Sequence, residues 1–169
     1  MQRIAKFYKV SQEQFVNDYK DTFGGSEGDI LKIYESIKLP VRATAGSAGY
    51  DFCTPVSFIL KPDETIKIPT GIRAKMNEDW VLMVYPRSGL GFKYRLQLNN
   101  TVGVIDSDYY NSDNEGHIFI KITNDSNENK TLEVEAGKGF AQGIFMPYGI
   151  TEDDECEAVR NGGFGSTGK

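Results

Sequence analysis

Short apolar segments separated by turn residues dominate the chain beyond residue 50, and they constrain its fold more than any other feature. The candidate strands cover residues 56–60, 65–68, 71–76, 80–85, 96–98, 101–105, 117–123, 131–134 and 140–146. Within one of them, Ile118, Ile120 and Ile122 alternate with the residues of the other face, as in a strand with one buried side. This spacing predicts an all-β sandwich or barrel.

The N-terminal part of the chain follows a different pattern. Residues 4–10 can form a first strand, and Ser11-Gln12-Glu13-Gln14 has the form of a helix capping box. The apolar residues that then fall on one helical face are Phe15, Val16, Tyr19 and Phe23. We therefore predict an amphipathic helix from about 12 to 23, ended by Gly24-Gly25 and covering a sheet edge. Residues 29–35 fit either a short helical turn or part of a strand.

Composition indicates one domain and limits its partners. The 169 residues suffice for one domain with its own core. The chain has two cysteines, Cys53 and Cys156, which favours a reduced, cytoplasmic setting over a disulfide framework. No apolar run is long enough to cross a membrane, and the first residues do not open a signal peptide. A net charge of -5 argues against nonspecific binding of nucleic acid. A small anionic ligand would need local cations, backbone amides or a metal ion.

Two polar features lie close together in the stretch 85–109. The apolar pair Val104-Ile105 runs into Asp106, which places this carboxylate at a strand end that water can reach, within an acidic hairpin over 103–109. Earlier in the stretch, Arg87-Ser88-Gly89 forms a polar turn, and a cation and a hydroxyl beside a glycine suit an anion such as phosphate. Together these features predict activation of a water molecule next to a phosphate.

Five segments, in this order, resemble the motifs of the trimeric deoxyuridine triphosphatase (dUTPase) family. They are Ala48-Gly49-Tyr50-Asp51, Pro86-Arg87-Ser88-Gly89-Leu90, the run 103–109, the run 137–142 and the glycine-rich tail 160–169. This family hydrolyses dUTP to dUMP and pyrophosphate with Mg²⁺, which keeps uracil out of DNA and supplies dUMP for thymidylate synthesis. The resemblance implies a β-jelly-roll, or distorted β-barrel, that assembles as a homotrimer with active sites between subunits. In such a trimer, the two halves of the stretch 85–109 would serve different active sites.

The resemblance assigns roles in the reaction itself to four residues. Asp106 matches the catalytic carboxylate, which orients and deprotonates the water that attacks the α-phosphorus. Arg87 and Ser88 match phosphate ligands, and Ser88 reaches the oxygen between the α- and β-phosphates, where charge builds as pyrophosphate leaves. Gly89 belongs to the same phosphate-binding turn, and Gln142 matches a residue near the α-phosphate and the attacking water.

Further matching residues imply how the nucleoside is selected. Asn100 and the backbone that follows it resemble the hairpin that reads the uracil edge, because mispaired buried groups penalise the wrong base. The backbone groups concerned belong to Gly103, Val104, Ile105 and Asp106. Tyr109 matches the family residue that packs against the deoxyribose and leaves no room for a 2′-hydroxyl.

A metal site and a mobile lid complete the implied active site. Asp51 matches a residue that holds Mg²⁺ through metal-bound water, and His117, the single histidine, is expected to be structural. The resemblance implies a catalytic domain over 1–159 and a flexible lid over 160–169 that excludes water when it closes. The lid residues expected to contact the substrate are Arg160, Phe164, Gly165, Ser166 and Thr167, with Phe164 stacked on uracil and the others at the phosphates.

Three features depart from the usual pattern of the family. Between Arg160 and the double glycine Gly162-Gly163 there is one residue fewer than usual. A polar insertion at 110–115 lengthens the expected hairpin, and the N-terminal helix is extra. Two other functions are alternatives: a dCTP deaminase of the same fold, and a regulatory nucleotide-binding protein with little chemistry. The Ser107-Asp108-Tyr109 run and the glycine-rich tail favour the triphosphatase over the deaminase.

Overall fold

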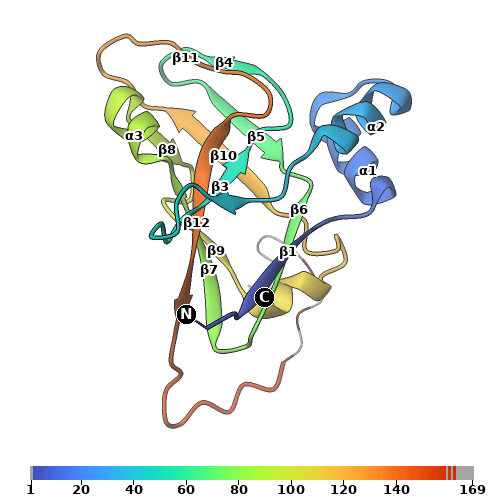
Figure 1. Ribbon diagram of the computed structural model, residues 1–169, viewed down its shortest axis with the longest axis vertical. Helices are drawn as coiled ribbons and strands as arrows, with labels where there is room; N and C mark the ends of the chain where they lie inside the picture. The colour runs from blue at the N-terminus through green and yellow to red at the C-terminus, as the bar shows by residue number, and fades with distance from the viewer. Residues whose placement is uncertain (1, 159, 161, 163–169) are drawn as a thin grey trace.

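The structure is a computed structural model that describes residues 2–158, 160 and 162, and strands make up most of its regular elements (Figure 1). The helical elements are α1 (Gln12–Phe23), α2 (Glu27–Ser36), α3 (Ser88–Tyr94) and the 3₁₀ helix η1 (Ser107–Asn111). The strands are β1 (Ala5–Lys9), β2 (Val41–Arg42), β3 (Tyr50–Cys53), β4 (Phe58–Leu60), β5 (Thr65–Pro69), β6 (Ile72–Met76), β7 (Trp80–Pro86), β8 (Leu96–Leu98), β9 (Gly103–Ile105), β10 (Phe119–Asn124), β11 (Leu132–Val134) and β12 (Gly139–Pro147).

The strands form one large antiparallel sheet and three smaller ones. The large sheet has the order β2-β3-β12-β7-β9, and the others are β5-β10-β8, β1-β6 and β11-β4. The side chains that fill the core between them include Phe52, Leu82, Ile120, Ile122, Leu132 and Phe140. The predicted all-β fold with an N-terminal helix is confirmed, although the sheets of the described residues do not close into one continuous barrel. None of the described helices is both long and apolar enough to cross a bilayer.

The strand predictions are confirmed by the structure. Each of the nine predicted segments corresponds to a strand whose ends differ by no more than two residues. In β10, Ile120 and Ile122 are buried while Lys121 is exposed, which is the alternation expected for one buried face. Strands β2 and β3 were not predicted, because both are short, and because β3 pairs with β12 far along the chain and β2 pairs only with β3.

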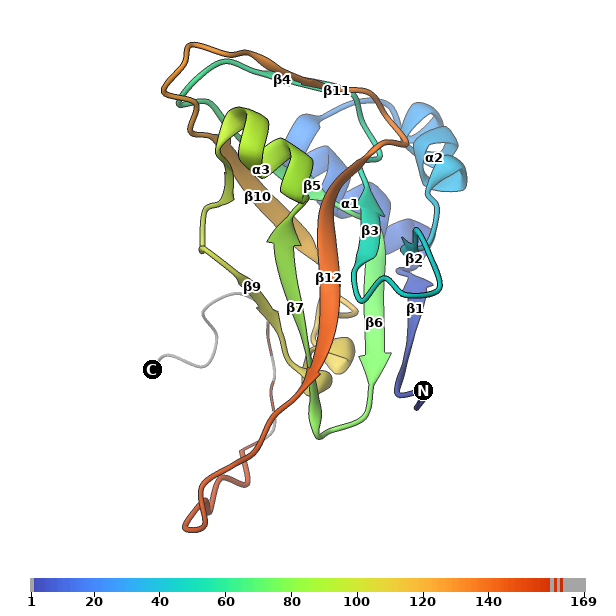
Figure 2. The same ribbon diagram turned by 60° about the vertical axis from the view of Figure 1, so that its left-hand side comes forward.

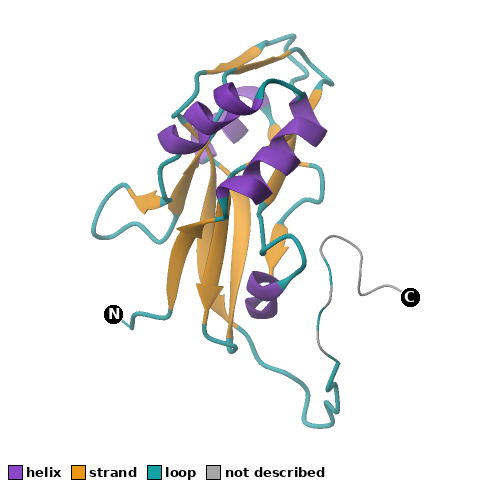
Figure 3. Cartoon of the chain, turned by 90° about the vertical axis from the view of Figure 1, so that its right-hand side faces the viewer, coloured by secondary structure: helices purple, strands orange, loops and turns teal. Residues whose placement is uncertain are grey.

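The N-terminal helix is confirmed, and a second helix follows it. Ser11 caps α1, since its hydroxyl accepts the backbone N–H of Gln14, and Gly24 ends the helix with a φ of 71°. Residues 29–35, which fit either a helical turn or a strand by sequence, are helical and belong to α2. Ser26 caps this helix, since its hydroxyl accepts the backbone N–H of Asp29. Both helices pack together, and α1 also packs on β5, an edge strand of its sheet (Figure 3).

The region after β9 differs from the predicted hairpin. Strand β9 ends at Ile105, and Asp106 is the N-cap of the 3₁₀ helix η1, which takes the place of the predicted hairpin tip. The insertion 110–115 therefore does not lengthen a hairpin. It ends η1 and forms a turn that contacts the start of α1, where the backbone N–H and the hydroxyl of Ser11 each donate to the Glu115 carboxylate at 2.7 Å.

This contact predicts acid-sensitive docking of α1. Partial burial opposes ionisation of Glu115, but the Ser11 hydrogen bonds and Arg73 lower its pKa below the ordinary 4.5. A depressed folded-state pKa gives stability that is present above about pH 4.5 and is lost as the pH falls. Glu115→Gln should melt about 2–4 °C below the wild type at pH 7, from a loss on the order of 1 kcal/mol, and the gap should shrink towards pH 3.5. Thermal melts followed by circular dichroism measure this gap, and a gap independent of pH would contradict the prediction.

Candidate active site

The predicted site residues of the large sheet share its outward face. Inward-facing Leu82 of β7 pairs with Ile105 of β9, so Asp106, one residue further, lies beside Val81 at the lower end of β7. Near the upper end of the same strand, Gln142 of β12 stands between Tyr85 and Asp51. The register of the four strands β3, β12, β7 and β9 therefore determines where each of these polar groups lies.

Asp106 opens into a cavity of about 930 Å³ at the lower end of the sheet. The cavity is bounded by residues of β6, β7 and β9, by η1 and by the segment after β12, which extends below the sheet and turns back (Figure 2). Arg160 lies at this cavity and pairs with the Asp106 carboxylate, while its Nε donates to Asp108 at 2.9 Å. The Asp106 carboxylate is still about half exposed, so water can reach it.

A second cavity, of about 450 Å³, collects the residues predicted to read the base. Asn100, Gly103, Val104 and Ile105 all line it. Its opposite wall comes from β5 and β10 and includes Lys67, Phe119 and Lys121, which the sequence did not single out. The signal for Phe119 was present, because it is an aromatic residue on the outward face of a strand whose inward face is aliphatic. Apolar walls with a few polar groups are typical of a site for a flat organic ring.

The predicted phosphate ligands meet at the upper end of the sheet. Arg87 pairs with Asp51, at 3.3 Å between Nε and Oδ1. Ser88 is the first residue of α3 and is exposed. The side-chain amide of Gln142 donates to the Pro86 carbonyl at 3.1 Å. Arg87, Ser88 and Gln142 line a cavity of about 510 Å³. Gly89, next in the turn, is exposed.

Gly49 of the first predicted motif has a packing role that the sequence did not reveal. A Cβ at position 49 would lie 2.6 Å from Oε1 of Gln142, so the glycine leaves the space that this side chain occupies. Gln142 also pairs with Asp51 across β3 and β12. The motif around Gly49 therefore supports the position of Gln142 as well as that of Asp51.

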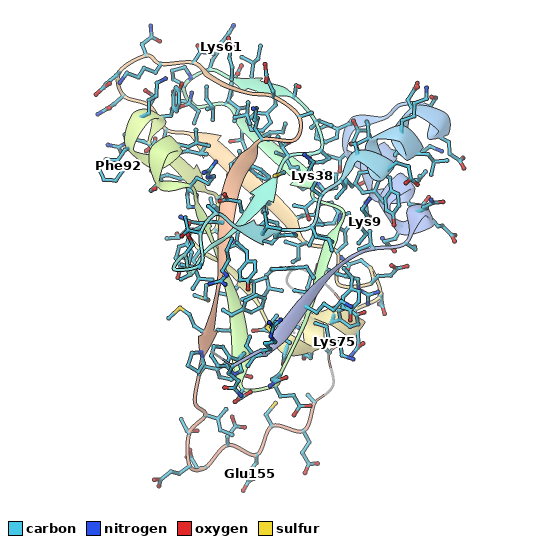
Figure 4. The ribbon with its side chains drawn as sticks, viewed as in Figure 1. Lys9, Lys38, Lys61, Lys75, Phe92 and Glu155 are labelled. Carbon is cyan, nitrogen blue, oxygen red and sulfur yellow. The ribbon has the colours of Figure 1, made fainter. Side chains whose placement is uncertain are left out.

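Within one chain, Asp106 lies far from the turn Arg87-Ser88-Gly89, which we call the phosphate turn. Asp106 lies beside Val81, and Arg87 follows six residues later along β7. At about 3.3 Å per strand residue the two are roughly 20 Å apart. In Figure 4, Phe92, at the cavity of Arg87, lies at the upper left, and Lys75, at the cavity of Asp106, lies lower on the right. A carboxylate and a phosphate ligand that far apart cannot act on one phosphorus atom.

Tyr109 is held firmly beside Asp106. Its side chain is 6% exposed, its hydroxyl donates to the carbonyl of His117 at 2.8 Å, and its N–H donates to the carbonyl of Asp106 at 3.2 Å. Burial raises the pKa of Tyr109, with a further contribution from Asp18, so the hydroxyl stays protonated as a donor. The contact of its ring with a deoxyribose stays a prediction.

The remaining predicted groups are the metal site and the lid. Within residues 2–158, 160 and 162, His, Cys, Asp and Glu side chains form no cluster of three or more that could hold a metal ion. Asp51 has a side chain about one quarter exposed on the outward face of the sheet. Phe164, Gly165, Ser166 and Thr167 lie outside the described residues, so only Arg160 of the predicted lid contacts is placed.

Comparison with known proteins gives consistent matches. The dUTPase family model matches residues 35–168. The deoxyuridine 5'-triphosphate nucleotidohydrolase of Lactococcus lactis is 44% identical over 135 residues, which cover 78% of this chain and 89% of that protein. The dUTPase of Streptococcus mutans has a similar structure, with a TM-score of 0.63, 33% identity, and 86% and 98% of the two chains covered. A variant dUTPase of Staphylococcus aureus phage phi11, whose structure shows coordination of a structural Mg(II) ion, has a TM-score of 0.63, 19% identity, and 92% and 98% covered.

Proposed function

Because the chain belongs to the dUTPase family, whose reaction is hydrolysis of dUTP to dUMP and pyrophosphate, we propose that Asp106 activates the attacking water. The observation that carries this proposal is that Val104 lines both the base cavity and the Asp106 cavity. A uracil bound against β9 therefore directs its phosphates towards Asp106. The carboxylate accepts a proton from water as the oxygen attacks the α-phosphorus, and the bond from phosphorus to the bridging oxygen breaks to release pyrophosphate.

The base cavity supports selection of uracil by the backbone. The turn between β8 and β9 carries Asn100, and the strand that follows brings N–H and carbonyl groups of Gly103 and Ile105 to the cavity wall. Uracil presents one ring N–H between two carbonyls, whereas cytosine reverses the polarity at that nitrogen and at the exocyclic group. A fixed backbone edge therefore leaves cytosine with unpaired polar atoms, each of which costs about 1–3 kcal/mol.

We propose that a second copy of the chain supplies the phosphate turn, as in a homotrimer with active sites between subunits. The separation of roughly 20 Å along β7 supports this, because Arg87, Ser88 and Gln142 cannot reach the phosphorus next to Asp106 of their own chain. The outward face between the two ends is apolar and consists of Val81, Met83, Val104, Ile144 and Met146. Val104 is 55% exposed and Met146 is 44% exposed, so a neighbouring subunit would gain from covering them.

In the shared site, the phosphate turn stabilises the leaving group. The Ser88 hydroxyl donates to the oxygen between the α- and β-phosphates, and Arg87 offsets the charge that develops as pyrophosphate leaves. Gly89 brings a backbone N–H to the phosphates, and Gln142 orients the water from the other side. Gln142 lies within β12, and Arg87, Ser88 and Gly89 directly follow β7 at the start of α3, so strands and a helix position these groups.

We propose that Mg²⁺ binds with the triphosphate and that Asp51 holds it through metal-bound water. A carboxylate beside Arg87 suits this role, since Mg²⁺ keeps several waters and takes its other ligands from the phosphates. When bound, the ion would neutralise phosphate charge. In this arrangement Arg87 would donate to a phosphate oxygen, and Asp51 would accept hydrogen bonds from water bound to the ion.

We propose that residues 160–169 form the lid on the catalytic domain 1–159. Arg160 supports this, because its pairing with Asp106 and Asp108 holds the start of the tail at the edge of the catalytic cavity. From there the tail can bring Phe164 over the uracil and Gly165, Ser166 and Thr167 to the phosphates. We also propose a cytoplasmic location, in keeping with the free thiols of Cys53 and Cys156.

The reaction is tested by comparing dUTP, dCTP and UTP as substrates. We expect rapid release of pyrophosphate from dUTP and at least about 10²-fold lower kcat/KM for dCTP and UTP, because each presents a group that the site cannot pair or accommodate. Chelation of Mg²⁺ should lower turnover. Pyrophosphate and ammonia are measured in parallel, and ammonia released from dCTP would overturn the assignment in favour of the deaminase alternative.

A further inference from the structure

Helix α1 contributes a carboxylate to the surroundings of the single histidine. His117 is fully buried, and its Nδ1 lies 2.5 Å from Oδ2 of Asp18, although 99 residues separate the two in sequence. The amide of Gln14 donates to the same Asp18 oxygen at 2.8 Å. Residues 12–34 lie outside the part of the chain that matches the dUTPase family model, so Asp18 belongs to a segment that this model does not describe.

The hydrogen bonds of His117 define its tautomer and orientation. Nε2 accepts the backbone N–H of Gly71 at 2.8 Å, so the ring proton is on Nδ1 and is donated to Asp18. Gly71 has a φ of +72°, and a Cβ there would lie 2.4 Å from Ile37, so the backbone that meets Nε2 has one close-fitting conformation. The ring is therefore held at both nitrogens.

The backbone of His117 passes this restraint to the proposed active site. Its carbonyl accepts the hydroxyl of Tyr109 at 2.8 Å, and the N–H of Tyr109 donates to the carbonyl of Asp106 at 3.2 Å. The ring of His117 also lies 4.6 Å, between centroids, from Phe119 of the base cavity. A continuous series of contacts thus runs from α1 to Tyr109 and to the turn that carries Asp106.

The same turn is held by α1 at a second point. Ser11, the N-cap of α1, binds Glu115 through two hydrogen bonds of 2.7 Å, and Arg73 binds the carbonyl of Tyr110 at 2.5 Å while stacking on its ring. Glu115 and His117 flank Gly116, so both ends of this short segment contact the helix. The turn therefore cannot shift without breaking contacts to α1.

We propose that Asp18 is a positioning residue for sugar selection: through His117 it fixes Tyr109 against the deoxyribose and so tightens discrimination between dUTP and UTP. This inference rests on the role predicted from the sequence for Tyr109, that its ring packs against the deoxyribose of the proposed substrate. A displacement of an ångström or less suffices to admit a 2′-hydroxyl and loosen the fit of the correct sugar. Asp18 itself contacts no substrate in this scheme.

The test compares kcat and KM for dUTP and UTP in Asp18→Ala. We expect the ratio of the two kcat/KM values to fall about tenfold, chiefly through a higher KM for dUTP, with kcat for dUTP changed less than about threefold. Asp18→Asn keeps an oxygen that accepts from Nδ1 and should restore most of the ratio. Asp21→Ala, an exposed aspartate on the same helix, is the matched control and should leave the ratio unchanged.

Tyr109→Phe and Tyr109→Ala separate failure of this inference from failure of the underlying role. Tyr109→Phe removes the hydroxyl contact and should mimic Asp18→Ala, and the double variant should lose little more. If Tyr109→Ala leaves the ratio unchanged, the proposed role of Tyr109 is wrong. If Tyr109→Ala lowers the ratio and folded Asp18→Ala does not, only the role of Asp18 is wrong. If Asp18→Ala does not fold, Gln14→Ala tests the same contact, because it removes the amide that donates to Oδ2 of Asp18. The ratio of kcat/KM for dUTP to that for UTP should then fall about twofold, and an unchanged ratio overturns the proposal.

Discussion

Asp106→Asn is expected to lower kcat for dUTP by about 10²–10⁴, because an amide has the shape of the carboxylate but cannot take a proton from water. Binding of the product dUMP should stay within about threefold of the wild type, since the base cavity does not depend on the charge of Asp106. Pyrophosphate release measures the first quantity and titration calorimetry measures the second. Loss of turnover with retained binding would identify Asp106 with the chemical step.

Asp108→Asn is the matched control for this substitution. Asp108 lines the same cavity and also pairs with Arg160, so the variant removes an equivalent charge and ion pair without changing the proposed base. Its kcat should remain within about tenfold of the wild type. Turnover by Asp106→Asn at the wild-type rate would exclude Asp106 as the general base. An equal fall of kcat in both variants would instead show that the loss of an ion pair with Arg160 causes it.

Mixing two inactive variants should restore activity if the site is shared between copies. Ser88→Ala removes the donor to the leaving group and should lower kcat by about 10²–10³. Refolded together, the Ser88→Ala and Asp106→Asn chains form mixed trimers, in which some sites combine an intact Asp106 with an intact Ser88. Random mixing of equal amounts gives roughly a quarter of such sites, so the mixture should reach about that fraction of wild-type turnover.

The control mixes two variants whose lost groups belong to one half of the site. Ser88→Ala mixed with Gln142→Ala, both from the phosphate end of the sheet, should yield the same fraction of intact sites only if those two residues also come from different copies. We expect no recovery in this mixture. Absence of recovery in the Ser88 and Asp106 mixture, with mixed trimers present by native mass spectrometry, would show that one chain builds the whole site.

All strands except β2 and β3 were predictable, because local signals agree with the final structure. The inward residues of β10 recur at every second position, and turn residues bound each segment. Helix α3 was missed because its Ser88-Gly89-Leu90-Gly91 start has poor helix propensity, so tertiary contacts must outweigh it. The helix α2 remained open from sequence, since its single N-cap was a weak signal beside an irregular apolar pattern.

The site was predictable as a set of residues and much less so as a geometry. Motifs point to Asp106 and Ser88 individually, but the roughly 20 Å between them depends on the register of β7 with β9, which no local pattern encodes. The contact of Asp18 with His117 joins residues 99 positions apart, and neither residue belongs to a motif. His117 was expected to be structural, and its buried, doubly hydrogen-bonded ring agrees with that expectation.

The outward face of the large sheet carries both the proposed subunit contact and both halves of the proposed active site. Under this arrangement a newly synthesised chain can fold its core completely and still have no catalytic activity. Catalysis would then begin with assembly, and protein concentration would set the onset of activity. A defect in association would be indistinguishable from a defect in chemistry in any assay that follows the product alone.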